Sequence, residues 1–380
     1  MAKTDIAKKA LALHKKLGGK IRIVPAAPIR NRAELSLVYT PGVAAVSSYV
    51  AKNPKEARRY TMKGRSVAVI SDGSAVLGLG NIGALGALPV MEGKAAIFKT
   101  FADIDTVPIV LDTQDADEIV ETVLRIAPAF GGINLEDIAA PKCFEIERRV
   151  IDALDIPVMH DDQHGTAIVV LAGLLNALKV VGKKIGTARI VISGAGAAGT
   201  ATAHLLHAAG ALNIVMLDSK GVISSVRDDL TPHKKELAKF TNPDGVQGGL
   251  REALNGSDVL IGVSGPGLAT AEDIRRMAKG AIVLAMANPI PEIMPDEAKR
   301  GGASVVGTGR SDFPNQINNS LAFPGIFRGA LDHKVTKITE AMKLKAAHAI
   351  AALVPKPTAT RIVPDMFDKR VAKAVAKVIR

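Results

Sequence analysis

Two pairs of adjacent acidic residues each follow a short apolar run in this 380-residue chain. Glu136-Asp137 follow I-N-L, and Asp161-Asp162 follow P-V-M-H. If both runs are parallel strands joined by a helix, the two pairs meet at one edge of a sheet. Carboxylates gathered there would repel one another, and Mg²⁺ or Mn²⁺, which take oxygen ligands, would relieve that repulsion. The pattern therefore favours a divalent metal site over the alternative, in which each pair caps the next helix or faces water.

A lysine and a tyrosine are candidates for proton transfer. Lys94 lies near the end of the helical pattern A-L-P-V-M-E-G-K-A-A-I, in apolar surroundings. Burial beside a metal would lower its pKa and make it a base near neutral pH, whereas most lysines are solvated. Tyr39 precedes the turn T-P-G. It is either a proton donor or, on this pattern alone, a packing residue.

The second chemical signature is G-A-G-A-A-G at residues 194–199. A β-branched strand precedes it, an alanine-rich helix follows, and the next strand, N-I-V-M-L-D, ends at Asp218, 24 residues after Gly194. This context predicts a dinucleotide site in which the helix N-terminus holds the pyrophosphate. The turn residues expected at this site are Gly194, Gly196, Ala197, Ala198 and Gly199.

Asp218 bears on the choice of cofactor. An acid at this position accepts a hydrogen bond from the ribose 2′-hydroxyl and repels a 2′-phosphate. We therefore expect NAD to be preferred over NADP, or both to be accepted. Lys220 weakens this expectation, because a nearby cation could tolerate the phosphate.

Three asparagines are candidates for contacts with cofactor or substrate. Asn288 follows the predicted strand 281–285 and would emerge at the carboxyl edge of the sheet, where nucleotide and substrate meet. Asn318 and Asn319 stand at a predicted helix start, where helix capping is the alternative role.

The elements around these residues alternate between strand and helix. We predict strands at 66–70, 107–111, 259–263 and 281–285, and helices ending near Leu17 and spanning 43–50, 116–129, 165–181 and 271–277. The fold class is therefore α/β. We expect a Rossmann-like, doubly wound parallel-sheet nucleotide domain, an N-terminal α/β substrate domain and C-terminal helices in 331–380.

Charge is unevenly distributed along the chain. Residues 1–65 carry 15 Lys and Arg against three acids, so this basic segment accounts for the whole net charge of +12. Such a segment could bind nucleic acid, attract an anionic substrate or simply be a solvated surface. Aromatic residues make up only 3% of the chain and Trp is absent, which argues against nucleic-acid binding.

Three further features indicate a cytoplasmic protein. Cys143 is the single cysteine, which excludes an internal disulfide. The charged helical pattern at the N-terminus lacks the apolar centre of a signal peptide. No run of 18 apolar residues is present, so we expect no membrane span.

Eight motifs in the same order resemble those of the malic enzymes of the short bacterial or archaeal type. They are Y-T-P-G-V-A, S-D-G-S-A-V-L-G-L-G-N-I-G, M-E-G-K-A, L-E-D-I-A-A-P-K-C-F-E-I-E, D-D-Q-H-G-T-A, G-A-G-A-A-G, A-N-P and F-P-N-Q-I-N-N-S-L-A-F-P-G. The resemblance covers nearly the whole chain. It implies an oxaloacetate-decarboxylating malate dehydrogenase, which converts L-malate to pyruvate and CO₂ with reduction of NAD or NADP and with Mg²⁺ or Mn²⁺. It also implies a catalytic domain at 1–158, a nucleotide domain with C-terminal helices at 159–380, and a homodimer or larger homo-oligomer.

The resemblance also implies roles for single residues. It makes Lys94 the general base, Asp161 the partner of that lysine and Tyr39 the general acid. The positions that match the family's metal ligands are Glu136, Asp137 and Asp162, and those near the substrate and nicotinamide are Asn288 and Asn319, with Asn318 as an alternative to Asn319.

One position departs from the family pattern. Larger members have an arginine for a substrate carboxylate where this chain has Ala75. Another cation, with Arg30 and Arg32 as weak candidates, or main-chain amides must then bind the carboxylate. Two rival functions remain open: a two-domain dehydrogenase acting on an amino acid or a folate, and a nucleotide-sensing protein that binds nucleic acid through its basic N-terminal segment.

Overall fold

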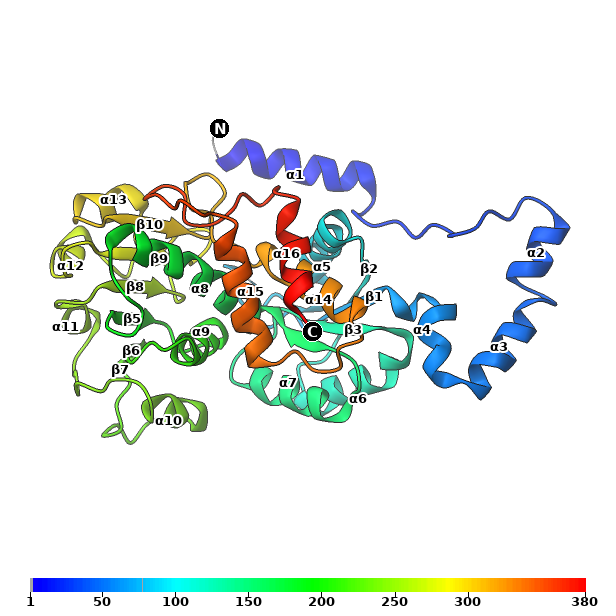
Figure 1. The fold of residues 1–380 in the computed structure, drawn as a ribbon, viewed down its shortest axis with the longest axis horizontal. Coiled ribbons are helices and arrows are strands. Elements are labelled where there is room, and N and C mark those ends of the chain that lie inside the picture. The colour runs from blue at the N-terminus through cyan, green and yellow to red at the C-terminus, as the bar shows by residue number, and fades with distance from the viewer. Residues whose placement is uncertain (1–2, 77) are drawn as a thin grey trace.

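The chain folds around two sheets of mainly parallel strands (Figure 1). The computed structural model describes residues 3–76 and 78–380. The first sheet is parallel throughout its described strands, in the order β2-β1-β3-β4. Its strands are β1 (Ser66–Ser71), β2 (Asp105–Val110), β3 (Gly132–Leu135) and β4 (Val158–His160). The helices between them are α5 (Gly83–Ala102), α6 (Ala116–Ile126), η3 (Ala127–Ala129) and α7 (Lys142–Ala153).

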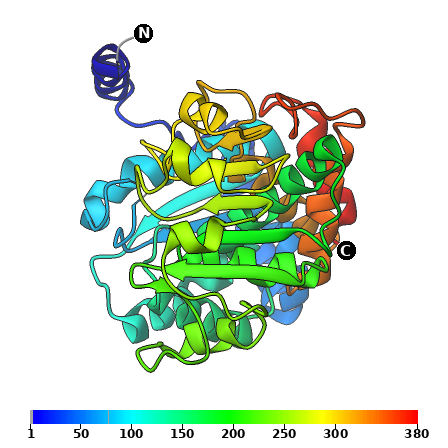
Figure 2. The same cartoon turned by 90° about the vertical axis from the view of Figure 1, so that its left-hand side faces the viewer.

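The second sheet has the order β10-β9-β8-β5-β6-β7, and β7 alone among its described strands is antiparallel. Figure 2 turns this part of the molecule toward the viewer. The strands are β5 (Arg189–Ser193), β6 (Asn213–Asp218), β7 (Gly221–Val222), β8 (Val259–Gly262), β9 (Ile282–Ala285) and β10 (Val305–Thr308). The helices are α9 (Ala197–Ala208), α10 (Pro232–Ala238), α11 (Leu250–Leu254), α12 (Ala271–Arg275) and α13 (Pro295–Arg300).

The direction of strand addition reverses at β5, which lies between β6 and β8. A ligand in a doubly wound sheet binds at such a switch point, beyond the carboxyl ends of the strands. The predicted α/β class and the Rossmann-like nucleotide sheet are therefore confirmed.

One long helix, α8 (Asp161–Val181), connects the two sheets and begins four residues before the predicted start. It ends where Gly182 adopts a left-handed conformation with φ 70°. By length and composition α8 could cross a membrane, but 67% of its apolar window is buried inside the protein. Its apolar side chains belong to the core that the two sheets share, which accounts for its composition.

The C-terminal helices follow η4 (Asn319–Leu321) and are α14 (Phe323–Asp332), α15 (Glu340–Ala352) and α16 (Arg370–Val378). Of these helices, α14 and α16 return to α5 beside the first sheet, whereas α15 packs on α8 and α9. The ring of Phe98 on α5 lies 4.7 Å from that of Phe323 and 5.5 Å from that of Phe327, measured between centroids. The division of the chain into two domains at residue 158 stays a prediction. Helix α14, which follows that residue, packs against α5, which precedes it.

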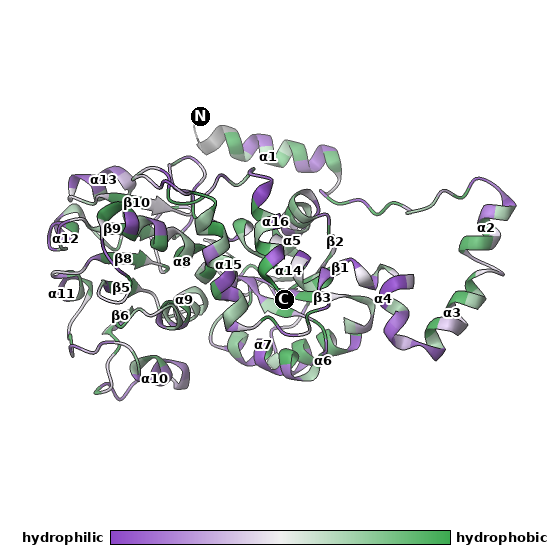
Figure 3. Cartoon of the chain, viewed as in Figure 1, coloured by the Kyte–Doolittle hydropathy of each residue, from purple (hydrophilic) through white to green (hydrophobic). Residues whose placement is uncertain are grey.

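The N-terminal elements are α1 (Lys3–Leu17), α2 (Arg32–Val38), α3 (Val43–Lys52), η1 (Pro54–Glu56), α4 (Ala57–Tyr60) and η2 (Met62–Gly64). We call residues 21–60 the N-terminal arm. Figure 1 shows the arm reaching away from both sheets. Neither α2 nor α3 contains a buried residue, although Figure 3 shows hydrophobic residues along both helices.

Candidate active site

The two acidic pairs meet because β3 and β4 are parallel neighbours. Leu135, the last residue of β3, pairs with His160, the last residue of β4. Glu136 and Asp137 therefore leave β3 beside Asp161 and Asp162, which form the first turn of α8.

Three of the four acids are arranged like a metal site. One carboxylate oxygen each of Glu136, Asp137 and Asp162 lies within 4.8 Å of the others. Glu136 and Asp137 are buried and Asp162 is partly exposed. Burial raises the pKa of Glu136 well above its usual value, although Lys94 acts to lower it. The cluster thus holds more negative charge than its protein surroundings readily stabilise.

Lys94 is buried among these acids, with 7% of its surface exposed. Its Nζ lies 2.5 Å from Asp161 Oδ2, 2.7 Å from Glu136 Oε1 and 4.2 Å from the centre of the Phe323 ring. Burial acts to lower the pKa of Lys94, but Asp161 and Glu136 outweigh it and raise the pKa. This direction is opposite to the one expected from the sequence, because that expectation assumed a bound cation beside the lysine.

The side chain of Asp161 has room only because Gly165, one helical turn later on α8, has no side chain. A Cβ atom at Gly165 would overlap Asp161 Oδ1. That oxygen is buried and has no hydrogen-bond partner in the described part of the chain, while Oδ2 accepts a hydrogen bond from Lys94. The geometry therefore pairs Asp161 with the lysine rather than with the three clustered acids.

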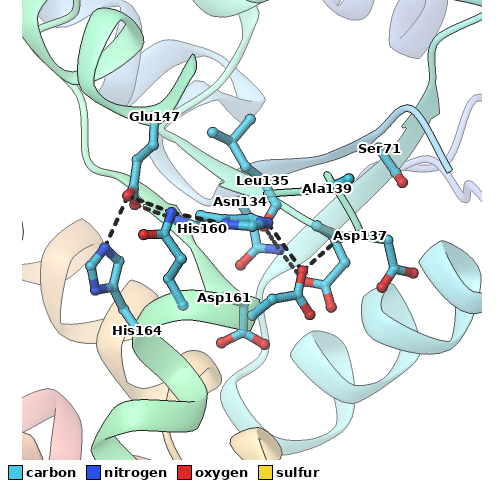
Figure 4. A network of polar contacts seen from close by, with 12 residues as sticks. Ser71, Asn134, Leu135, Asp137, Ala139, Glu147, His160, Asp161 and His164 are labelled. Atoms are coloured by element: carbon cyan, nitrogen blue, oxygen red, sulfur yellow. Dashed lines mark hydrogen bonds and ion pairs between the residues drawn. The ribbon is translucent and has the colours of Figure 1, made fainter. Parts of the chain in front are cut away.

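Asp162 is held by the main chain of Asp137 and by His160, a residue for which the motif indicated no role. The main-chain N–H of Asp137 donates to Asp162 Oδ2 at 2.7 Å, and Nε2 of the buried His160 lies 3.1 Å from the same oxygen (Figure 4). These contacts lower the pKa of Asp162, although burial acts in the opposite direction. The H-D-D sequence was the available signal, but a histidine before two acids does not by itself reveal this role.

A second buried network lies behind His160. Glu147 Oε1 accepts a hydrogen bond from the His160 main-chain N–H at 2.7 Å, and its Oε2 lies 3.0 Å from both Gln163 Nε2 and His164 Nε2 (Figure 4). Lys343 Nζ lies 2.9 Å from the other ring nitrogen of His164. Burial acts to raise the pKa of Glu147, but His164 and Lys343 lower it to about 2.

The glycine-rich turn after β5 has the spacing that a dinucleotide site requires. Gly194 has φ 119°, and a Cβ there would lie 2.6 Å from the Val263 carbonyl oxygen. A Cβ at Gly199 would overlap the Gly194 carbonyl, so this glycine allows α9 to pack closely on the turn. Space is open beside Gly196, which precedes the first turn of α9 at Ala197 and Ala198.

A cavity of about 670 Å³ extends from Asp162 to this turn. Its lining includes Asp162, Ala75, residues 196–198, Asn288, Asn318 and Asn319. Two of the asparagines have structural partners as well: Asn318 Oδ1 accepts from the Ser320 N–H at 2.9 Å, and Asn288 Nδ2 donates to Met286 O at 3.3 Å. The predicted capping role and cavity position of Asn318 therefore coexist.

The structure does not bring every predicted residue to this cavity. Tyr39 lies on the N-terminal arm with 66% of its surface exposed. Arg30 and Arg32 lie on the same arm, where Arg30 pairs with Glu34 at 3.2 Å. Asp218 ends β6 beside the glycine turn, since the Gly194 N–H donates to Leu217 O at 2.9 Å.

Two family models together match nearly the whole chain. Residues 18–151 match "Malic enzyme, N-terminal domain", and residues 163–380 match "Malic enzyme, NAD binding domain".

Individual proteins are similar over the same length. The chain is 55% identical over 378 residues to the bifunctional malic/malolactic enzyme of Bacillus subtilis, covering 99% of this chain and 92% of that protein. It is 52% identical to the NAD-dependent malic enzyme of Geobacillus stearothermophilus, covering 99% and 78%. The crystal structure of a Thermotoga maritima NAD-dependent malic enzyme superposes with a TM-score of 0.94 at 48% identity, covering 97% and 98%.

These matches include both sheets, the acidic pairs and the glycine turn, and they confirm the resemblance seen in the motifs. The chain therefore belongs to the malic enzyme family, whose members are NAD- or NADP-dependent oxidoreductases.

Proposed function

We propose that this chain oxidises and decarboxylates L-malate to pyruvate and CO₂, with reduction of NAD or NADP and with a divalent metal held by Glu136, Asp137 and Asp162. One observation carries the proposal. The three carboxylates gather within 4.8 Å, and one of them, Asp162, lines a cavity that the glycine turn also lines, so metal, substrate and nicotinamide can meet there.

The residues present fit a hard divalent cation. Glu136 and Asp161 both pair with Lys94, and the clustered oxygens of Glu136, Asp137 and Asp162 are ligands that Mg²⁺ and Mn²⁺ prefer. A cation bound there supplies a Lewis acid for the C2 oxygen of malate and for the ketone formed from it, and a bound nicotinamide supplies the hydride acceptor.

Lys94 is our candidate for the base that removes the proton of the C2 hydroxyl, in a site where a bound cation would offset the negative charge that raises the pKa of this lysine. Its Nζ contacts both Asp161 and the proposed ligand Glu136. Asp161 accepts a hydrogen bond from the ammonium and so fixes its position. Loss of CO₂ then leaves an enolate whose C3 carbon must be protonated, which requires a second acid.

Tyr39 is our candidate for that acid, and a second copy of the chain must then supply it. The N-terminal arm exposes large apolar side chains, which a folded chain normally covers. They include Ile23, Val24, Ile29, Leu37, Tyr39, Tyr49 and Tyr60. No residue of the described helices α2 and α3 is buried, so the arm presents an apolar surface that a second chain could cover.

A receiving surface lies beside the cavity. Leu79 and Ile82, just before α5, and Leu85 and Val90, in its N-terminal half, are also exposed. Leu79 follows Gly78, which lines the cavity. An isologous dimer that exchanges arms across these surfaces would cover both and would bring Tyr39 and the arm's arginines toward the partner's cavity. We therefore infer a homodimer in which each site uses the body of one chain and the arm of the other.

The reaction is tested by the absorbance at 340 nm with L-malate and Mn²⁺, using NAD and NADP separately. We expect reduced cofactor to form, and to stop forming when a chelator removes the metal. A folded chain that produced no reduced cofactor with either nucleotide, with Mn²⁺ or Mg²⁺, would contradict the proposal.

Arm exchange is tested by mixing two inactive variants, Lys94→Ala and Tyr39→Phe, after joint unfolding and refolding. In a hybrid dimer one site would combine an intact body with an intact arm, so about a quarter of the wild-type activity should return at random pairing. If each chain uses its own Tyr39, every site carries one defect and no activity returns. Refolded wild type mixed with Lys94→Ala is the control for recovery.

We also infer a cytoplasmic location, which the single buried Cys143 supports.

A further inference from the structure

A buried glutamate lies beyond the end of β9, where main-chain groups rather than a basic side chain hold it in the described part of the chain. Only 1% of the surface of Glu292 is exposed. Burial raises the pKa of Glu292, and the main-chain N–H groups that bind its carboxylate act in the opposite direction. Burying an acid is costly unless hydrogen bonds satisfy it, so an acid in such surroundings beside a cavity is a candidate for a functional role.

The two oxygens of this carboxylate connect two separate loops. Glu292 Oε1 accepts a hydrogen bond from the Ser264 main-chain N–H at 2.8 Å, and Oε2 accepts one from the Ala287 main-chain N–H at 3.1 Å. Ser264 follows β8 and Ala287 follows β9, and these two strands are neighbours in the second sheet. One side chain therefore bridges the carboxyl ends of two adjacent strands.

The main chain around Glu292 strengthens the attachment to the first of these loops. The Gly267 N–H donates to the Pro291 carbonyl and the Ala269 N–H donates to the Glu292 carbonyl, each at 3.1 Å. The loop after β8 is thus attached by main-chain bonds as well as by the carboxylate. The start of the loop after β9 is attached through the bond from Ala287 to Oε2.

The ends of the neighbouring strands are shaped around the carboxylate. A Cβ at Gly262, the last residue of β8, would lie 2.4 Å from Glu292 Cδ, so this glycine leaves the room that the acid occupies. Ser264 Oγ lies 3.5 Å from Glu292 Oε1 and 3.2 Å from the Oγ of Ser193, the last residue of β5. A row of polar contacts that begins at Glu292 therefore crosses the ends of three strands.

The two bridged loops form part of the cavity wall. Ser264 and Ala287 line the cavity, as does Asn288, which follows Ala287 directly. In the second sheet β8 and β9 lie on one side of β5, and β6 lies on the other. A dinucleotide bound across the switch point, with its adenosine toward β6, extends its nicotinamide toward β8 and β9.

We propose that Glu292 is a positioning residue for the nicotinamide, because its carboxylate holds the loops at Ser264 and Ala287, and with them Asn288, in the arrangement that the ring binds. The proposal rests on the proposed function only in placing a nicotinamide cofactor in this cavity.

The test compares a reduced cofactor with the matching fragment that lacks nicotinamide, by calorimetric titration of the full chain. The cofactor is whichever of NADH and NADPH binds wild type more tightly, and the fragment is ADP-ribose or its 2′-phosphate accordingly. In Glu292→Gln an NH₂ group replaces one acceptor oxygen, so one buried main-chain N–H loses its acceptor. The ratio of cofactor affinity to fragment affinity should fall roughly 10-fold, while fragment binding stays unchanged.

A second variant and a control separate bridging from other effects. Glu292→Asp keeps both acceptor oxygens but is one methylene shorter, so it cannot reach both loops, and we expect a similar fall in the ratio. Glu297→Gln is the matched control, because Glu297 Oε1 also accepts a main-chain N–H, from Ala271 at 3.3 Å. It should bind both ligands like wild type. Thermal unfolding of each variant is recorded alongside.

An unchanged ratio in both Glu292 variants would overturn the proposal, and so would equal affinity of wild type for cofactor and fragment. Loss of folding in both variants, or an equal loss of affinity for the two ligands, would show a purely structural role and would overturn it too. Malate oxidation by wild type with an unchanged ratio in the variants would refute this inference alone. The expected fall in the ratio without any malate turnover by wild type would refute the proposed function alone.

Discussion

Acidic residues follow strands in both sheets, but the charges around them are opposite. Beyond β3 and β4, three carboxylates cluster within 4.8 Å of one another, and one of them, Glu136, shares Lys94 with Asp161. Beyond β6, Asp218 and Asp229 share Arg227, Lys234 and Lys220. The first arrangement attracts a cation and the second attracts an anion. An acid at the end of a strand therefore has no fixed chemical meaning, because the balance of neighbouring charges decides what it can bind.

The largest effect expected from this difference concerns Asp162→Asn. The substitution removes a metal ligand. Loss of a residue that only supports a ligand typically lowers metal affinity by roughly 10- to 100-fold. Mn²⁺ affinity and malate turnover should each fall by more than this. Titration of free Mn²⁺ by electron paramagnetic resonance measures the affinity directly. Asp218→Asn is the control and should bind Mn²⁺ like wild type. Equal losses in the two variants would mean that the two acidic sites are not chemically distinct.

A smaller effect is expected for His160→Asn, which removes the contact 3.1 Å from Asp162 Oδ2 but leaves all three carboxylates. Mn²⁺ affinity should fall by roughly 10- to 100-fold. High Mn²⁺ should restore most of the turnover, which separates a positioning role from a direct catalytic one. His348→Asn, on the exposed side of α15, provides the control. Unaltered Mn²⁺ affinity in His160→Asn would show that Asp162 needs no such support.

Asp218→Asn should change cofactor choice by only a few fold. The substitution removes one negative charge and leaves Arg227 and Lys234 in a more positive site, so the ratio of kcat/KM for NADP to that for NAD should rise. Metal dependence should not change. A fall in the ratio would show that Asp218 acts through the position of Arg227 rather than through its charge.

Glu147→Gln should affect turnover least and act mainly on stability. The pKa of Glu147 is lowered from 4.5 to about 2. The ionised form therefore contributes stability that is fully present above pH 4.5 and is lost as the pH falls toward 2. Its loss should cost about 3 kcal/mol at pH 7. Urea unfolding should show the two proteins converging below pH 4.5, and a constant difference down to pH 3 would contradict this assignment.

Local patterns in the sequence were sufficient to predict much of the fold. The β-branched run before Gly194 and the apolar runs before Glu136 and Asp161 predicted strands that the structure contains. The return of α14 to the first sheet could not be predicted in this way. It depends on contacts such as Phe323 with Phe98, which are far apart in sequence and carry no periodic signal.

The active site likewise has features that could be predicted from the sequence and features that could not. The clustering of Glu136, Asp137 and Asp162 follows from strand adjacency and was predictable. The engagement of Asp218 was not, because Arg227 and Lys234 come from a loop and a short helix, 9 and 16 residues later. The position of Tyr39 was not predictable either, since its motif specifies a turn but not which way the arm extends.

The return of the chain through η4 also has a mechanical consequence. The backbone passes from the part built on the first sheet to the part built on the second at the start of α8, and it returns at Asn318 and Asn319. Two backbone connections therefore join these two halves, and residues of both connections line the cavity. Paired tethers of this kind restrict relative motion to rotation about the line that joins them. Across the cavity Gly78 packs against the Asn288 carbonyl, without a covalent link between the two halves at that contact. We expect the rim at Gly78 and Asn288 to be the gate that opens for substrate, while the carboxylates beside the hinge stay nearly still.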